Sequence, residues 1–556
     1  STVASNPATN SSRSNSAPAS GTTAASRGSQ ANTASAAPAA NAATAPNTFE
    51  DQWRKYIHDG MIANTAATAK NVGANAAFLS QQQPAQPAAG GNFEINILPD
   101  PNIYDGRFAN NGWMQELPKP LNKVTWDNVG LISPKTAEKL GINVSNRAEE
   151  YVGGDHGTAF VNTKGTNQFS DTVNLTYQGN AINNVPMWIT PGQPDDVITV
   201  FMGYGRTHAG NIGTGVGYDV FSSRPSTALD FGTGNLQKTG EQVTISSTQI
   251  HFNMEGRDLL RSWDLEAYNE DPKIGEQEDV YPESMYPYQQ HEETYEKHHR
   301  WGMTVDLNNC VGCNACVIAC QAENNIPVVG REQVNRHRMM HWLRIDAYFG
   351  GENIDHPNGP HFQPVLCQQC EQAPCEVVCP VHATVHSAEG LNDMVYNRCV
   401  GTRYCSNNCP YKVRRFNFLL YQDWDTPQYK LMRNPEVSIR SRGVMEKCTY
   451  CTQRIAAARI EAEKDGREVR DGEIVTACQA ACPTNVFTFG NMNDHSSQVA
   501  KIKENDPRNY KLLNELNTQP RTTYLAELRN QNKEMPDYVA PKGPEGGNLS
   551  QSSNTL

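Results

Sequence analysis

Residues 310–320 read CVGCNACVIAC, a run in which two, two and three residues separate four cysteines. Three more cysteine groups follow, and each of them ends in a cysteine with proline directly after it. These groups are Cys367, Cys370, Cys375 and Cys379; Cys399, Cys405 and Cys409; and Cys448, Cys451, Cys478 and Cys482. All 15 cysteines of the 556-residue chain therefore fall in one stretch.

This spacing is typical of the loops with which bacterial ferredoxins hold 4Fe–4S clusters, often with a proline after the last cysteine. Thiolate sulfur is a soft, charged ligand that suits iron in a sulfide cage. A disulfide framework is instead typical of short secreted chains, and structural zinc would explain only isolated C-x2-C pairs. Covalent haem is not expected, because no C-x-x-C pair precedes a histidine. The pattern predicts iron–sulfur clusters.

The cysteine groups must be paired, because in two-cluster ferredoxins the fourth cysteine of one motif ligates the cluster of the other. We pair the first group with the fourth, and the second group with the third. The predicted ligand sets are set A, Cys310, Cys313, Cys316 and Cys482; set B, Cys320, Cys448, Cys451 and Cys478; set C, Cys367, Cys370, Cys375 and Cys409; and set D, Cys379, Cys399 and Cys405.

Set D lacks a fourth cysteine. The C-x2-C-x2-C rhythm would place one at position 402, where the chain has Thr402. A hydroxyl is a poor iron ligand beside thiolates, so the corner that it faces would tend to lose its iron. We therefore predict three 4Fe–4S clusters and one 3Fe–4S cluster. The alternative for set D is a 4Fe–4S cluster with oxygen or water on its fourth iron.

Length and charge limit what the whole chain can be. A chain of 556 residues is too long for one core, so two or more domains are expected. The net charge of −12 argues against a nucleic-acid partner. No run reaches the roughly 18 apolar residues of a membrane span, so any membrane role should come through partners. The chain starts at Ser1 without a signal-peptide core, and we expect a processed chain or the later part of a longer one.

Changes in composition divide the chain into expected segments. Residues 1–46 are mostly Ala, Ser, Asn, Thr and Pro, which favours a flexible linker. Phe49, Trp53, Tyr56 and Ile57 stand at near-helical spacing and favour a short amphipathic helix. The expected segments are a linker 1–46, a helical segment and linker 47–94, a β-barrel domain 95–263, an acidic linker 264–299, a cluster domain 300–534 and a tail 535–556.

Short β-rich stretches recur in the front half, at residues 185–189, 196–201 and 242–245, and favour a β-barrel or sandwich. Residues 133–141 read as a short helix with Ser133 as its N-cap and proline at its first position. Glycine-containing loops at 203–217 could cradle a phosphate, but tight turns between strands explain them more simply. We expect an α+β multidomain chain, with a barrel in front and a double ferredoxin-like domain behind.

The cluster region resembles the four-cluster beta subunits of the complex iron–sulfur molybdoenzyme family, such as those of dimethyl sulfoxide and polysulfide reductases. The matching pieces are residues 306–313, 316–324, 397–399 and 409–417. The front region is similar to the carboxy-terminal, molybdopterin-dinucleotide-binding-like barrel of molybdopterin oxidoreductase large subunits, on residues 125–129, 133–141 and 188–193. With both regions on one chain, residues 47–530, roughly, resemble the fused iron–sulfur and molybdopterin-like subunit of bacterial alternative complex III.

That resemblance implies an electron-transfer subunit of a membrane-associated quinol:electron-acceptor oxidoreductase with a cytochrome c-type acceptor. One cluster in that family is 3Fe–4S, in agreement with Thr402. The resemblance also implies a barrel without molybdenum cofactor and a chain without covalent haem or catalytic residues. The implied partners are a membrane-embedded quinol-binding subunit, multihaem and monohaem cytochrome c subunits and the remaining molybdopterin-like segment. The implied location is the periplasmic face of the bacterial inner membrane.

Two other functions stay open: an electron-transfer subunit of a quinone-linked molybdenum or tungsten reductase, and a scaffold that the clusters only stabilise. We further expect the set D cluster to lie nearest the membrane partner, with residues 411–418 as much of its docking face. Lys412, Arg414 and Arg415 in that segment could dock on an acidic partner, lower the cluster's charge or simply face solvent. Alternatively, the three-iron cluster lies buried in the middle of the electron path.

Overall fold

The computed structural model describes residues 48–62, 64–68, 92–144, 169–248, 259–275, 277, 295, 298–349, 354–357 and 359–535. The chain divides into two compact units, residues 1–84 and 85–556. The predicted linker 1–46 and nearly all of the predicted tail lie outside the described residues, as does much of the predicted acidic linker. Within the described part of the chain, no helix is long and apolar enough to cross a membrane.

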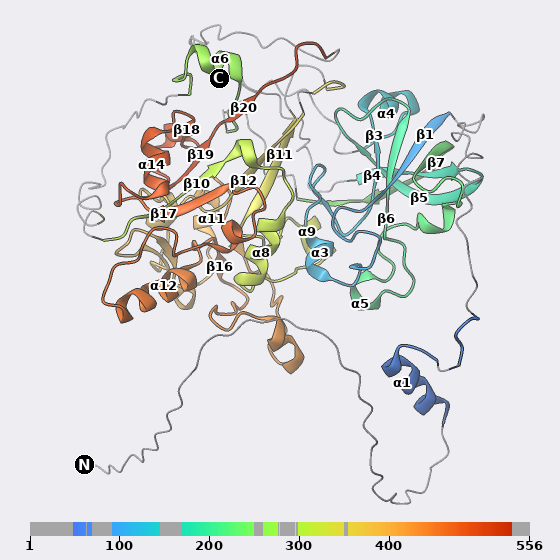
Figure 1. Ribbon diagram of the computed structural model, residues 1–556, viewed down its shortest axis with the longest axis horizontal. Helices are drawn as coiled ribbons and strands as arrows, with labels where there is room; N and C mark the ends of the chain where they lie inside the picture. The colour runs from blue at the N-terminus through green and yellow to red at the C-terminus, as the bar shows by residue number, and fades with distance from the viewer. Residues whose placement is uncertain are drawn as a thin grey trace, which may run out of the picture. The chain divides into compact units, whose positions relative to one another are not determined.

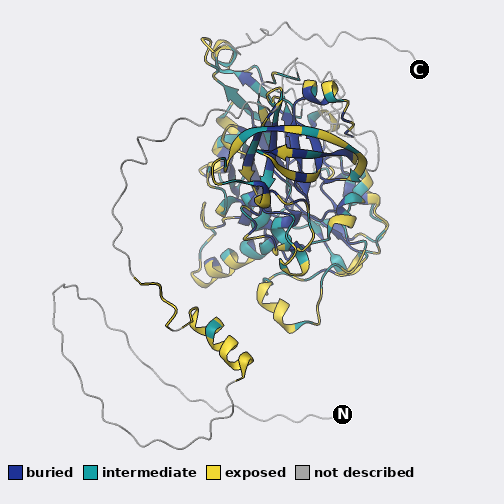
Figure 2. Ribbon diagram, turned by 90° about the vertical axis from the view of Figure 1, so that its right-hand side faces the viewer, coloured by how far each residue is buried: buried dark blue, intermediate teal, exposed yellow. Residues whose placement is uncertain are grey.

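The first unit contains helix α1 (Phe49–Asp59). The Thr48 hydroxyl accepts a hydrogen bond from the Asp51 amide, and the Asp51 carboxylate accepts one from the Thr48 amide, so a capping box starts the helix. Gly60 ends it with a left-handed φ of 66°. Phe49 and Trp53 stack 6.3 Å apart, and no residue of α1 is buried (Figure 2).

The second unit begins with a closed barrel of six strands in the order β1-β6-β3-β5-β4-β7 (Figure 1). Strands β1 and β6 pair in parallel, as do β3 and β5, and the other main pairs are antiparallel. The strands are β1 (Phe93–Pro99), β3 (Gly130–Ile132), β4 (Phe169–Tyr177), β5 (Asn180–Ile189), β6 (Val197–Met202) and β7 (Phe231–Thr244). The predicted barrel is confirmed.

Buried and more exposed residues alternate along the strands, and the buried ones form the barrel core. Phe93, Ile95 and Ile97 of β1 point inward and are buried, while the residues between them are more exposed, as the two-residue period of a strand requires. Helix α4 (Pro134–Leu140) covers one end of the barrel. Ser133 caps it by accepting from the Thr136 amide, and proline stands in its first turn, as predicted. The other short elements here are α3 (Gly112–Glu116), β2 (Val124–Thr125), α5 (Gly210–Gly213), η1 (Phe221–Ser223) and β8 (Ser246–Ser247).

The cysteine region is built on a four-stranded sheet in the order β17-β10-β19-β18. Its strands are β10 (Trp301–Asp306), β17 (Phe487–Asn491), β18 (Asn509–Tyr510) and β19 (Thr522–Leu525). Four two-stranded pieces join β11 (Arg344–Phe349) to β12 (Pro360–Val365), β13 (Thr384–His386) to β14 (Asn392–Met394), β15 (Arg415–Phe416) to β16 (Met445–Glu446), and β9 (Ser262–Asp264) to β20 (Glu527–Arg529).

Short helices link these strands and carry five of the 15 cysteines. They are α6 (Leu265–Glu270), η2 (Leu307–Asn309), α8 (Ala315–Glu323), α9 (Arg331–Asn335), α10 (Pro374–Val377), η3 (Tyr396–Arg398), α11 (Tyr404–Asn408), η4 (Pro427–Met432), α12 (Thr452–Lys464), α13 (Ala477–Ala480), α14 (Gln498–Asn505) and η5 (Asn514–Leu516). Leu260 and Trp263 pack into the core of this region.

The barrel and the cysteine region contact each other through α3 and the turn before α9. The buried Glu116 carboxylate at the end of α3 accepts hydrogen bonds from the amides of Val329 (3.0 Å) and Gly330 (2.7 Å). The Asn314 side chain, next to Cys313, donates to the Pro118 carbonyl at 2.6 Å. The barrel domain therefore contacts the cysteine region directly at the loop that carries set A.

Candidate metal centres

Within each predicted cysteine set, the thiols lie close enough for their charges to act on one another. All 15 cysteines are free thiols, and most are buried. Burial raises the pKa of one thiol in each set, and the charges of its set partners raise it further. These partners are Cys310, Cys313 and Cys482 for Cys316; Cys448, Cys451 and Cys478 for Cys320; Cys367, Cys375 and Cys409 for Cys370; and Cys399 and Cys379 for Cys405.

The sets are also linked to one another in a row. Burial raises the pKa of Cys316 in set A, and the charge of Cys478 in set B raises it further. Burial likewise raises the pKa of Cys448 in set B, and the charge of Cys367 in set C raises it further. The Arg414 guanidinium lies between sets C and D, because thiols of both sets act on its charge. These charge effects connect A with B, B with C, and C with D, and the Asn314 contact with Pro118 joins set A to the barrel domain.

The loops of sets A and D repeat each other in sequence and backbone. Residues 310–316 read CVGCNAC and residues 399–405 read CVGTRYC. Gly312 and Gly401 both have positive φ, at 68° and 78°. The next left-handed residue is Asn314 (φ 62°, ψ 9°) in one loop and Arg403 (φ 62°, ψ 7°) in the other. Thr402 therefore occupies the backbone position of Cys313.

Both loops face outward at the same point. Val311 is 59% exposed and Val400 is 65% exposed, although each stands directly after a cysteine. Cys313 is exposed, and so is Thr402. The corner at which set D lacks a thiolate is therefore on the surface, where water can reach it.

Backbone amides point at the sulfur atoms. The Ala383 amide donates to Cys379 Sγ at 3.2 Å, and the Val486 amide donates to Cys482 Sγ at 3.3 Å. Each of these amides stands four residues after the cysteine of a Cys-Pro pair, so the two turns are equivalent. Hydrogen bonds to sulfur favour the thiolate form and are one of the means by which proteins set cluster potentials.

The chemistry of the thiols fits iron–sulfur clusters. Burial raises the pKa of Cys478 to about 12, and the charge of Cys451 adds to the effect. Several buried thiolates in one place therefore need positive charge beside them, which cluster iron supplies. No group of three or more His, Cys, Asp or Glu side chains in the described ranges forms a site for a metal ion. Cluster ligands surround the corners of a cage and do not converge on one point.

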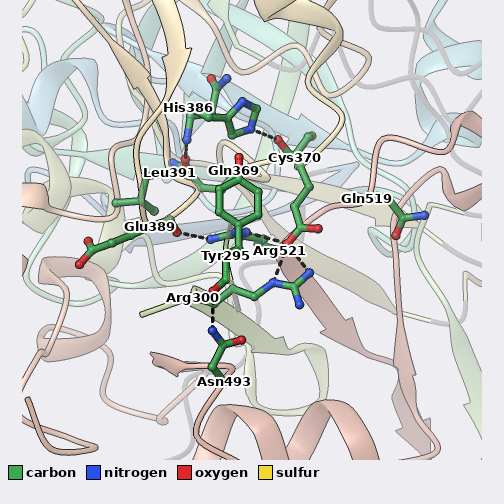
Figure 3. A network of polar contacts seen from close by, with 12 residues as sticks. Tyr295, Arg300, Gln369, Cys370, His386, Glu389, Leu391, Asn493, Gln519 and Arg521 are labelled. Atoms are coloured by element: carbon green, nitrogen blue, oxygen red, sulfur yellow. Dashed lines mark hydrogen bonds and ion pairs between the residues drawn. The ribbon is translucent and has the colours of Figure 1, made fainter. Parts of the chain in front are cut away.

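A polar network fixes the loop of set C from behind (Figure 3). Glu371, directly after Cys370, accepts hydrogen bonds from Arg300 Nε at 2.7 Å and from Arg521 Nε at 3.0 Å. The His386 ring contacts the Cys370 carbonyl at 2.9 Å. The network holds the backbone of the loop at Cys370 and Glu371 in place.

The predicted docking face at residues 411–418 is wrong. Arg414 and Arg415 are buried, as are Tyr411, Val413 and Asn417. Arg414 Nη2 donates to the Thr384 hydroxyl at 2.7 Å, and its Nε and Nη1 have no hydrogen-bond partner among the described residues. Arg414 is buried where thiols of sets C and D act on its charge. Of the basic residues in the segment, only Lys412 is exposed.

The cysteine region is similar in sequence to known iron–sulfur proteins. A family model described as "4Fe-4S dicluster domain" matches residues 296–383. The chain is 38% identical, over 41% of its length and 89% of the relative's, to the iron–sulfur cluster-binding subunit of menaquinone reductase from Nitratidesulfovibrio vulgaris. It is 34% identical to the iron–sulfur subunit of a dimethyl sulfoxide reductase, named as putative, from Halobacterium salinarum, over 40% of the chain and 78% of the relative.

A third relative is the Hdr-like menaquinol oxidoreductase iron–sulfur subunit 1 of Archaeoglobus fulgidus, at 34% identity over 38% of the chain and 77% of the relative. Two of these three names refer to a menaquinone or menaquinol. The relatives are covered over most of their length, whereas they cover about two-fifths of this chain. The chain belongs to the family of iron–sulfur subunits of quinone-linked reductases, which contain a 4Fe-4S dicluster domain.

Proposed function

We propose that this chain carries electrons, one at a time, along the row of sets A to D within a quinol-oxidising membrane complex. What supports the proposal is that thiols of neighbouring sets act on one another's charge, because electron transfer along a chain requires neighbouring centres. The donor would be a quinol held by a membrane-embedded partner, and the acceptor a haem-bearing cytochrome c-type partner. The chain would be a peripheral subunit on the periplasmic face of the inner membrane.

Sets A, B and C would each hold a 4Fe–4S cluster, and set D a 3Fe–4S cluster. When bound, these clusters supply the one-electron carriers. The chain's own residues position them: the Cys-Pro turns direct amides at sulfur, and apolar side chains keep water from the inner thiols. The outward-facing Thr402 supports the three-iron assignment, because a hydroxyl cannot replace a thiolate at that corner.

Set D would lie nearest the membrane partner, since it stands at the end of the row away from the barrel. The buried Arg414 is then no docking residue. Its Nε and Nη1 have no hydrogen-bond partner among the described residues, and thiols of sets C and D act on its charge. A cation there favours the reduced, more negative form of a cluster, so Arg414 would hold the potential of this end high enough to accept electrons from a quinol.

The barrel would be a molybdopterin-binding-like domain that has kept its shape without a cofactor. The glycine loops support this view, because their glycines serve close packing inside the chain. A Cβ on Gly205 would lie 2.2 Å from the Asp219 backbone nitrogen, and one on Gly203 would lie 2.9 Å from the Gly106 backbone nitrogen. Both glycines have positive φ, so the loops read as tight turns between strands.

The second candidate is an electron-transfer subunit of a quinone-linked molybdenum or tungsten reductase, with electrons running from the membrane to that cofactor. The names of the relatives favour it, because they include dimethyl sulfoxide and selenate reductases. A pterin bound to the purified complex would support this function, and haem in its place would support a cytochrome c-type acceptor. A scaffold function would require clusters that a quinol cannot reduce.

The first test is the metal content of the purified complex. Three four-iron clusters and one three-iron cluster amount to about 15 irons per chain. We expect that content and a 3Fe–4S resonance in the oxidised state. We also expect this resonance to disappear when a quinol reduces the cluster. An iron content near 16 without a 3Fe–4S signal would contradict the assignment of set D. Clusters that stay oxidised with excess quinol would contradict the proposed function.

A further inference from the structure

A buried lysine of the barrel domain faces set A. Lys123 lies in the segment between α3 and β2 and is 1% exposed. Its amide donates to the Lys119 carbonyl at 3.1 Å, and its carbonyl accepts from the Thr248 amide at 3.0 Å. Its Nζ has no hydrogen-bond partner among the described residues. The backbone of Lys123 is therefore fixed, while its ammonium group is buried without a hydrogen-bond partner in the part of the chain that the structure describes.

The Phe362 ring connects this ammonium group with the loop of set A. Nζ lies 5.7 Å from the centre of the Phe362 ring. That ring packs on the loop of set A, because a Cβ on Gly312 would meet it at 2.5 Å. Burial lowers the pKa of Lys123 to about 8, and the charges of Asp346, Cys310 and Cys316 act in the opposite direction. The acidic groups that act on the charge of Lys123 are thus one carboxylate and two thiols of set A.

The carboxylate already has a cation of its own. Arg344 Nε contacts both oxygens of Asp346, at 3.0 and 3.1 Å. A buried ammonium group without a counter-charge is costly, so its position calls for another negative group nearby. Four thiolates outweigh the charge of a cluster core, and a cluster on set A would therefore be that negative group.

Resting on the proposed function, we propose that Lys123 is the counter-charge of the set A cluster and raises its reduction potential. The barrel domain then has a function beyond its shape: through one side chain it sets the potential at its own end of the electron path. Reduction adds negative charge to the cluster, and a fixed cation stabilises the reduced form more than the oxidised form. Lys123 touches no reacting partner, so it is a tuning residue.

Lys119 offers a matched control on the same segment. It is also buried, but its Nζ donates to the Asp127 carbonyl at 2.7 Å and to the Tyr204 hydroxyl at 2.9 Å. It also pairs with Asp100 at 3.4 Å. Its charge is therefore satisfied inside the barrel, and its loss should leave the potential of set A unchanged even if it weakens the barrel.

The experiment is a redox titration of the complete complex, followed by electron paramagnetic resonance. Lys123→Met keeps the apolar stem and removes the charge. We expect at least a tenfold smaller equilibrium constant for reduction of the set A cluster, which is about 59 mV for a one-electron couple. Lys123→Arg should restore most of the wild-type potential, and Lys119→Met should not change it. The signal of set A is identified by its loss in Cys316→Ser.

An unchanged set A potential in Lys123→Met with full iron content would overturn the proposal. If that variant loses iron, Lys123→Arg and Lys123→Gln are compared, because they differ in charge at similar polarity. Equal potentials in that pair would overturn the proposal as well. Failure of the proposed function is read separately, from the iron content of the wild type and from reduction of its clusters by quinol.

Discussion

The variant Thr402→Cys is expected to gain one iron per chain and to lose the 3Fe–4S resonance of set D. The backbone at Thr402 matches that at Cys313, with left-handed residues on the same two sides. A cysteine there would place its thiolate as Cys313 does, without any change of the main chain. The fourth iron would then have a ligand, and the potential of the converted cluster should fall.

The reciprocal variant is Cys313→Thr, which gives the set A loop the sequence pattern of set D. We expect a second three-iron signal in that variant and about one iron fewer than in the wild type. Iron assay and electron paramagnetic resonance of the oxidised complex measure both effects. An oxidised-state signal that survives Thr402→Cys unaltered would mean that the three-iron corner lies elsewhere. A four-iron Cys313→Thr cluster would favour the alternative in which oxygen or water completes the cage.

The cysteine groups are local signals, because short spacings force each loop to surround one site. The pairing between distant groups follows the rule of two-cluster ferredoxins, and the charges of Cys482 and Cys448 act on Cys316 and Cys320 as that pairing requires. The helix at Ser133 was predictable for the same reason: its cap and first-turn proline are local signals. The ligand sets themselves stay a prediction until iron is measured.

The direction of side chains was not predictable from local signals. Residues 411–418 combine basic and aromatic residues, a composition typical of an exposed docking face, yet Arg414 and Arg415 point inward. The thiols of sets C and D that act on the charge of Arg414 come from separate stretches of the sequence and meet only in the folded chain. Lys123 gave no signal at all, because its relevance depends on a contact between two regions almost two hundred residues apart in sequence.

The variant Glu116→Ala is expected to weaken the contact between the barrel and the cysteine region by about 3 kcal/mol, because it leaves buried donors without an acceptor. The Glu116 carboxylate accepts from the amides of Val329 and Gly330 and from Trp126 Nε1, the last at 3.3 Å. Amide hydrogen exchange at Val329 and Gly330 should become about a hundredfold faster. The amide of Asn324 at the end of α8, which donates to the Cys320 carbonyl, serves as the internal reference.

The pH dependence of the same contact provides the sharper test. Burial raises the pKa of Glu116 from 4.5 to about 7, although its hydrogen bonds act in the opposite direction. Between these two values the folded state holds a proton that the unfolded state has lost, so the stability of the contact falls as pH rises toward 7. Glu116→Gln cannot ionise and should lack this fall. Protection factors of the Val329 amide between about pH 5.5 and 7.5 measure it. If wild type and Glu116→Gln lose protection in parallel over this range, Glu116 does not titrate there and the carboxylate stays ionised on its three donors.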